Sequence, residues 1–125
     1  MTLKKKSKQS GDVVKIAREI LLDKKAKNIA VIDLKNLENS VCDYFIVCSG
    51  NSNTQVDAIE SSVRKSVSKA LQDKPWHVEG LENSQWVLMD YVDVVVHIFQ
   101  KQTREYYDIE SLWGDAKITS IESNY

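Results

Sequence analysis

The segment WVLMDYVDVVVHIF, residues 86–99, decides how the sheet of this protein is built. Two apolar runs flank a short break, and this pattern predicts an antiparallel hairpin with its turn at Tyr91 and Val92. In that register Trp86 faces His97 across the strand pair. Because side chains alternate along a strand, the apolar residues divide between both faces of the sheet.

The two faces of this hairpin differ in character. One face is purely aliphatic and is expected to lie in the core; it carries Val87, Met89, Val94, Val96 and Ile98. The other face adds a tryptophan and a histidine; it carries Trp86, Leu88, Val95, His97 and Phe99. A sheet that is apolar on both faces needs a cover on each. Either a helix of this chain or a partner must therefore cover the second face.

Hydrophobic spacing predicts the other elements. Apolar residues at every third or fourth position predict helices over residues 11–25, 52–73 and 102–112. Short β-branched runs predict further strands at residues 28–34, 43–49 and 77–81. Ser52 and Gln55 have the spacing of a capping box at the start of the second helix. This order of elements predicts an α/β fold, a mixed β-sheet of about five strands with helices packed on it.

Length and composition indicate one domain. The chain has 125 residues with only one proline and four glycines, which disfavours a long linker. We expect a flexible basic tail at residues 1–10, a single domain at residues 11–116 and a C-terminal tail at residues 117–125. No apolar run approaches the roughly 20 residues that cross a membrane. The two cysteines are too few for a disulfide framework, so a cytoplasmic protein with reduced thiols is expected.

The net charge of −1 disfavours a protein that binds nucleic acid through general phosphate neutralisation. The only basic run that stands out in the sequence is Lys4 to Lys6 with Lys8, and a solvated chain start explains it. We expect no sequence-specific contact with nucleic acid.

Candidate catalytic groups are incomplete. His97 is a single metal ligand where three or four must converge, so a hydrogen-bonded histidine beside Trp86 is expected. The turn at residues 49–55 is similar to the glycine–serine start of nucleotidyltransferases, but no Asp-x-Asp pair follows it to hold magnesium. Cys48 lies in an apolar strand, where burial raises a thiol pKa and lowers reactivity. We expect no catalytic residue, cofactor or metal.

Four segments together resemble the ribosomal silencing factor family, also called the Iojap family. The segments are CDYFIVCSGNSNTQVDAI (42–59), HVEG (77–80), QWVLMDYVDVVVHIFQ (85–100) and REYYDIESLWGDA (104–116). The specific signal is their combination: a tryptophan before an Asp-x-x-Asp hairpin, Val-Val-His, then Arg-x-x-Tyr and Glu-x-Leu-Trp. The resemblance covers residues 11–116.

The resemblance implies a nucleotidyltransferase-like fold without the catalytic carboxylates, and a non-enzymatic role. It implies binding to protein number fourteen of the large ribosomal subunit, on the face that meets the small subunit. Such binding blocks association of the subunits and silences translation when nutrients are short. Relatives in organelles act in ribosome assembly or stability.

Aromatic residues and arginine dominate the energetics of protein interfaces. On that basis and on the resemblance, the expected partner-binding residues are Trp86, Tyr91, Asp93, His97, Arg104, Tyr107 and Trp113. The family usually has glycine where this chain has Val92, so a wider turn is an alternative there. The two-faced apolar hairpin also predicts a homodimer of the free protein at high concentration.

Two other functions stay open from the sequence. A large-subunit assembly factor would use the same surface. A divergent nucleotidyltransferase-like enzyme would need a carboxylate cluster from distant positions, with Asp33, Asp43 and Asp90 as the candidates.

Overall fold

The computed structural model describes residues 10–38, 40–114 and 116–121, and its centre is a mixed sheet of six strands in the order β3-β4-β5-β2-β1-β6. The helices are α1 (Ser10–Asp23), α2 (Asn53–Leu71), α3 (Lys101–Tyr107) and α4 (Ile109–Leu112). The strands are β1 (Lys27–Asp33), β2 (Tyr44–Gly50), β3 (His77–Glu79), β4 (Trp86–Asp90), β5 (Val94–Gln100) and β6 (Lys117–Ile121). The expected α/β fold with a mixed sheet is confirmed, with one strand more than expected.

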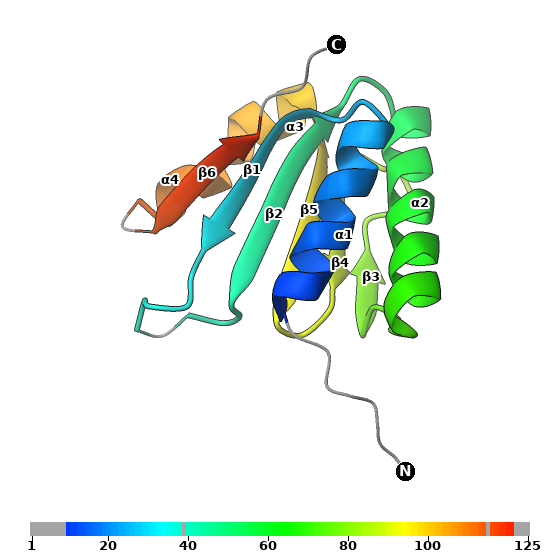
Figure 1. Cartoon of the computed structure of the whole chain (residues 1–125). Helices are drawn as coiled ribbons and strands as arrows, with labels where there is room; N and C mark the ends of the chain where they lie inside the picture. The colour runs from blue at the N-terminus through cyan, green and yellow to red at the C-terminus, as the bar shows by residue number, and fades with distance from the viewer. Residues whose placement is uncertain (1–9, 39, 115, 122–125) are drawn as a thin grey trace.

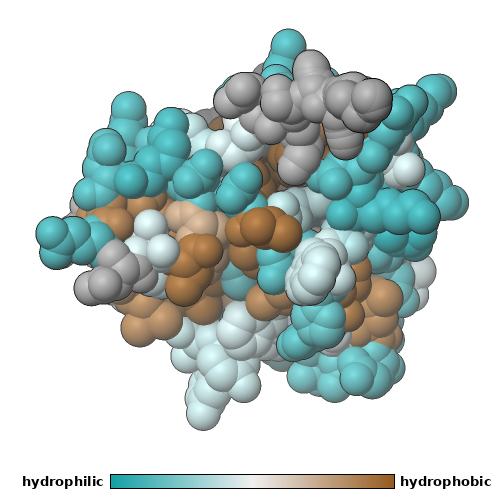
Figure 2. Space-filling view, turned by 90° about the horizontal axis from the view of Figure 1, so that it is seen from below, coloured by the Kyte–Doolittle hydropathy of each residue, from teal (hydrophilic) through white to brown (hydrophobic). Residues whose placement is uncertain are grey.

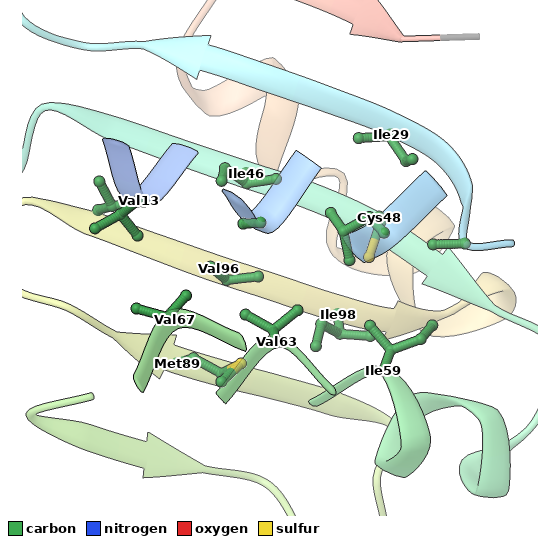
Figure 3. Packing of buried hydrophobic residues seen from close by; sticks show 14 of the residues in the cluster. Val13, Ile29, Ile46, Cys48, Ile59, Val63, Val67, Met89, Val96 and Ile98 are labelled. Atoms are coloured by element: carbon green, nitrogen blue, oxygen red, sulfur yellow. The ribbon is translucent and has the colours of Figure 1, made fainter. Parts of the chain in front are cut away.

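The helices cover the two faces of the sheet unequally. Figure 1 shows α1 and α2 side by side on one face, and the short helices α3 and α4 behind the other. Aliphatic side chains of β2, β4 and β5 fill the space under α1 and α2, with Val63 and Val67 of α2 lying over Met89 and Ile98 (Figure 3). None of the helices in the described ranges is long and apolar enough to cross a membrane.

The hairpin of β4 and β5 is shifted from its predicted register. Trp86 lies opposite Phe99 and Leu88 opposite His97, so the expected pairing of Trp86 with His97 is wrong by two residues. A shift of two keeps every side chain on its predicted face, because side chains alternate with a period of two. The division into an aliphatic and an aromatic face is therefore confirmed.

The shift arises because Val92 and Asp93 form the turn, and not Tyr91 and Val92. The Asp93 N–H donates to the Tyr91 carbonyl at 2.9 Å, which closes a γ-turn around Val92. Val92 has a φ of 77°, a region that a β-branched side chain resists. Asp90 Oδ1 accepts the Val92 N–H at 2.7 Å and caps the turn. Glycine, the usual residue of the family here, would adopt this φ without strain.

The second helix begins as its sequence predicts. Ser52 Oγ accepts the Gln55 N–H at 3.1 Å, and Gln55 Oε1 accepts the N–H of Asn51 at 2.6 Å, one residue before the cap. The helix ends at Leu71, and its C-cap Gln72 adopts the left-handed conformation and donates its N–H to Ser68 O. This C-cap turns the chain back along α2 toward β3.

The C-terminal quarter differs most from expectation. The single helix expected over residues 102–112 is two helices, separated by Asp108 with a φ of 47°. The expected tail at residues 117–125 is wrong for Lys117–Ile121, which forms β6 and pairs antiparallel with β1. Its side chains are mostly exposed, so an edge strand held by backbone hydrogen bonds left no apolar pattern in the sequence. Residues 1–9 and 122–125 of the two predicted tails lie outside the described residues.

Candidate functional site

Aromatic side chains gather on the face of the sheet opposite α1 and α2. We call this surface the aromatic face; its residues are Phe45, Trp86, Leu88, His97, Phe99, Tyr107 and Trp113. Trp86 is its centre. The indole stacks on the Phe99 ring at 4.8 Å between centroids, and Tyr107 of α3 lies 4.9 Å from the same indole.

Trp86 and His97 share a hydrogen bond, where the sequence predicted only a hydrogen-bonded histidine beside Trp86. Trp86 Nε1 donates to His97 Nδ1 at 3.1 Å. Since an indole N–H is only a donor, Nδ1 must be unprotonated, and the neutral ring carries its hydrogen on Nε2. Only 4% of His97 is exposed, and burial lowers its pKa to about 4. His97 is therefore a neutral, buried ring that fixes the orientation of Trp86.

Phe45 joins this face from the neighbouring strand. Its ring meets His97 at 4.6 Å and Trp113 at 5.8 Å, both in edge-on geometry. The sequence reasoning missed Phe45 because the parallel pairing of β2 with β5 was not foreseen. That pairing places Phe45 beside Val95 and Val47 beside His97. Once the pairing is known, strand alternation alone assigns Phe45 to the aromatic face.

The aromatic face is only partly covered by this chain. Ile109 of α4 is 5% exposed and packs into its core, whereas Trp86, Leu88 and Trp113 stay half-buried. On the short helices the rim is open, with Tyr107 at 49% and Leu112 at 75% exposure. Figure 2, which views the molecule from below, shows hydrophobic side chains exposed in patches among hydrophilic ones. A surface of this kind is typical of protein-binding sites.

Arg104 fixes the helix that carries Tyr107. Its guanidinium forms a two-point ion pair with Glu110, with N···O distances of 2.7 and 3.3 Å. It also donates to the Asn28 carbonyl at 2.6 Å and to Ser49 Oγ at 3.0 Å. The side chain is 11% exposed, so its donors are used within the chain. The structure places Arg104 where it positions α3 against β1 and β2.

Tyr91 does not lie at the exposed hairpin tip. It is 2% exposed and packs in the core on the other face of the sheet, so the prediction of a surface anchor there is wrong. The two-residue register shift moves the tip to Val92, which is 59% exposed. Burial, followed by the nearby charge of Asp73, raises the pKa of the Tyr91 hydroxyl. Asp93 is exposed at the turn, and its carbonyl accepts the N–H of Asp43 at 2.8 Å.

Residues 7–124 match the family described as ribosomal silencing factor during starvation. The chain belongs to the ribosomal silencing factor family. It is 40% identical over 111 residues to a ribosomal silencing factor of Bacillus subtilis, an alignment that spans 88% of this chain and 92% of that protein. A crystal structure from Chromobacterium violaceum superposes with a TM-score of 0.80 at 37% identity, covering 94% of this chain and 97% of that one.

A more distant relative belongs to an organelle. The mouse protein named mitochondrial assembly of ribosomal large subunit protein 1 is 30% identical over 96 residues. The alignment spans 75% of this chain and 42% of the mouse protein. The matched region is therefore part of a longer chain in the mouse protein.

The other candidate catalytic and metal-binding residues of this chain are buried or dispersed. Cys48 is fully buried, and desolvation raises its pKa to about 12; the same cause raises the pKa of Cys42 to about 11. The Ser49 hydroxyl, at the turn that resembles nucleotidyltransferases, accepts from Arg104. In the part of the chain that the structure describes, no group of three or more His, Cys, Asp or Glu residues is placed to hold a metal ion.

Proposed function

We propose that this protein binds protein number fourteen of the large ribosomal subunit on the face that meets the small subunit. By occupying that face in the cytoplasm, it blocks association of the two subunits and silences translation when nutrients are limiting. Family membership supports the ribosomal role. The observation that carries the binding mode is the aromatic face, where apolar side chains meet solvent beside a rigid hydrogen-bonded core.

The mechanism in this proposal is steric exclusion. Trp86 is held by Phe99 and His97, and Tyr107 is held by Trp86, so these rings lose little conformational freedom when a partner docks. Preorganised aromatic side chains at the centre of a contact supply most of its binding energy. A protein of 14.3 kDa seated on the intersubunit face then prevents approach of the small subunit.

The proposal is non-enzymatic. Its supporting observations are a buried neutral His97 and two buried thiols with raised pKa values, none of which offers a reactive group to a substrate. The competing enzyme hypothesis needs Asp33, Asp43 and Asp90 to bind magnesium and nucleotide together. Isothermal titration with both ligands tests it, and micromolar affinity would contradict the proposal.

Purified ribosomal subunits provide the direct test. Light scattering follows their association after the small subunit is added to large subunits that were preincubated with the protein. We expect a dose-dependent loss of joined ribosomes and co-sedimentation of the protein with free large subunits only. Equal recovery of the protein with joined ribosomes would sink the antiassociation proposal.

An assembly role is the second candidate, because the mouse relative is named for assembly of the large ribosomal subunit. A deletion strain separates the two functions. Accumulation of immature large subunits during growth favours assembly. An excess of joined, translating ribosomes during starvation favours silencing.

We also propose that the free protein forms a homodimer through the aromatic face. Self-association would cover the exposed parts of Tyr107 and Leu112 when the ribosome is absent. Light scattering over a concentration series measures the mass. A monomer at every concentration would contradict this proposal.

A further inference from the structure

A basic groove lies on the helix-covered side of the molecule, away from the aromatic face. It is formed by the last two turns of α2 and by the chain that doubles back from the helix C-cap. Its volume is about 530 Å³, and its lining consists of Arg64, Lys65, Ser68, Lys69, Lys74 and Pro75. Figure 1 places this end of α2 beside β3.

Four cations surround this groove in a protein whose net charge is −1. Lys65, Lys69 and Lys74 are exposed, and none forms an ion pair within residues 10–38, 40–114 and 116–121. Arg64 is paired with Glu60 at 2.9 Å. Lys65 and Lys69 are one helical turn apart, so their side chains point the same way and can both contact the same negatively charged chain.

An exposed tryptophan follows the groove-lining residues in the sequence. Trp76 follows Pro75 directly, and 80% of it is accessible to solvent. Its backbone is fixed, because the Trp76 N–H donates to the Asp90 carbonyl at 2.7 Å beside β4. Trp76 lies two residues after Lys74 and outside both buried hydrophobic clusters of the described residues. An exposed aromatic ring close to several lysines is typical of a single-stranded RNA site.

We infer that this groove binds single-stranded RNA, with Lys65, Lys69 and Lys74 contacting phosphates and Trp76 stacking on a base. The chemistry of the groove favours RNA over an acidic protein segment, because a carboxylate-rich peptide would leave the face of the indole unused. Recognition here depends on the backbone and on stacking, so it is not sequence-specific. The contact is local and agrees with the low net charge of the whole chain.

This inference adds an RNA contact to the proposed function and does not depend on the aromatic face. Its test uses purified protein and a labelled oligouridine, with no ribosomal protein present. Failure of RNA binding and failure of binding to protein fourteen are therefore separate results.

The experiment is fluorescence anisotropy of the labelled oligouridine over a salt series. With three phosphate contacts, we expect the parent to lose affinity roughly 10-fold between about 50 and about 150 mM KCl. The triple variant Lys65→Gln/Lys69→Gln/Lys74→Gln should bind more weakly and lose almost no further affinity over that range. Trp76→Ala should weaken binding roughly 10-fold and leave the salt dependence unchanged.

A matched control removes the same charge elsewhere. Lys15→Gln/Arg18→Gln/Lys117→Gln changes three exposed cations that do not line the groove, and it should bind RNA like the parent. Equal losses in both triple variants would overturn the site, since net charge alone would then explain binding. An unchanged affinity in Trp76→Ala, or displacement of RNA by polyglutamate at equal concentration, would overturn the RNA assignment. Circular dichroism verifies that each variant is folded.

Discussion

The two faces of the central sheet are both apolar, yet the helices cover them to different extents. Under α1 and α2 the side chains are aliphatic, and most of them are fully buried (Figure 3). On the aromatic face the strands carry rings, and the covering helices α3 and α4 span seven and four residues. The comparison teaches that an apolar strand does not by itself identify core. What matters is whether the chain supplies a cover long enough to seal it.

The sealed face should be the more sensitive to truncation. Ile46 is fully buried in β2 beneath α1, so Ile46→Ala should lower the free energy of unfolding by about 2–5 kcal/mol. Urea denaturation measures the change. Leu88→Ala is the control on the half-buried face and should cost clearly less, because Leu88 already contacts solvent. Equal losses would break the distinction between the faces.

The open face should show the opposite behaviour. Tyr107 is 49% exposed, so Tyr107→Ala should barely change the melting temperature. Affinity for the isolated ribosomal protein should fall by about 2–4 kcal/mol, or roughly 30- to 1,000-fold. Trp76→Ala removes an exposed ring that is not part of the aromatic face and should leave this affinity unchanged. A Tyr107→Ala variant that binds like the parent would show that the aromatic face is not the contact.

The buried histidine of the aromatic face makes the stability of the protein depend on pH. The pKa of His97 falls from 6.5 to about 4 in the folded protein. Between these pH values His97 is therefore protonated in the unfolded chain and neutral in the folded one. Above pH 6.5 His97 is neutral in both states and does not lower the free energy of unfolding. This free energy decreases as the pH falls from 6.5 toward 4. At about pH 5 we expect a loss of about 2 kcal/mol relative to neutral pH. His97→Gln should flatten this part of the stability profile, and an unchanged profile would contradict the assignment.

The turn between the two hairpin strands gives the smallest effect. Val92→Gly removes backbone strain of about 1–3 kcal/mol from the folded state. Glycine also raises the conformational entropy of the unfolded chain, which costs about 0.5–1 kcal/mol of stability. The free energy of unfolding should therefore rise by about 1 kcal/mol. Denaturation in urea measures it. Val41→Gly, at an exposed valine without positive φ, should be destabilising. If Val92→Gly also destabilises, strand packing and not the turn sets the register.

Hydrophobic periodicity in the sequence predicted much of this architecture, and the predictions that were wrong have physical causes. Alternation placed Trp86 and His97 on one face, because a register error of two residues leaves faces unchanged. The same error misplaced Tyr91, since only the turn decides which residue is at the tip. The basic groove was not found because its lysines are spread over α2 and the loop after it. Only the C-cap at Gln72 brings Lys74 back beside Lys65 and Lys69.

The position of β6 at the edge of the sheet has a consequence for synthesis. The ribosome makes the chain from its N-terminus, so β1 and β2 emerge long before Lys117–Ile121, which pairs with the outer edge of β1. Until then the N–H and C=O groups on that edge face solvent, and open edges recruit other strands. The outer edge of β1 therefore stays open to other strands until Lys117–Ile121 has been synthesised, and β6 then closes that edge.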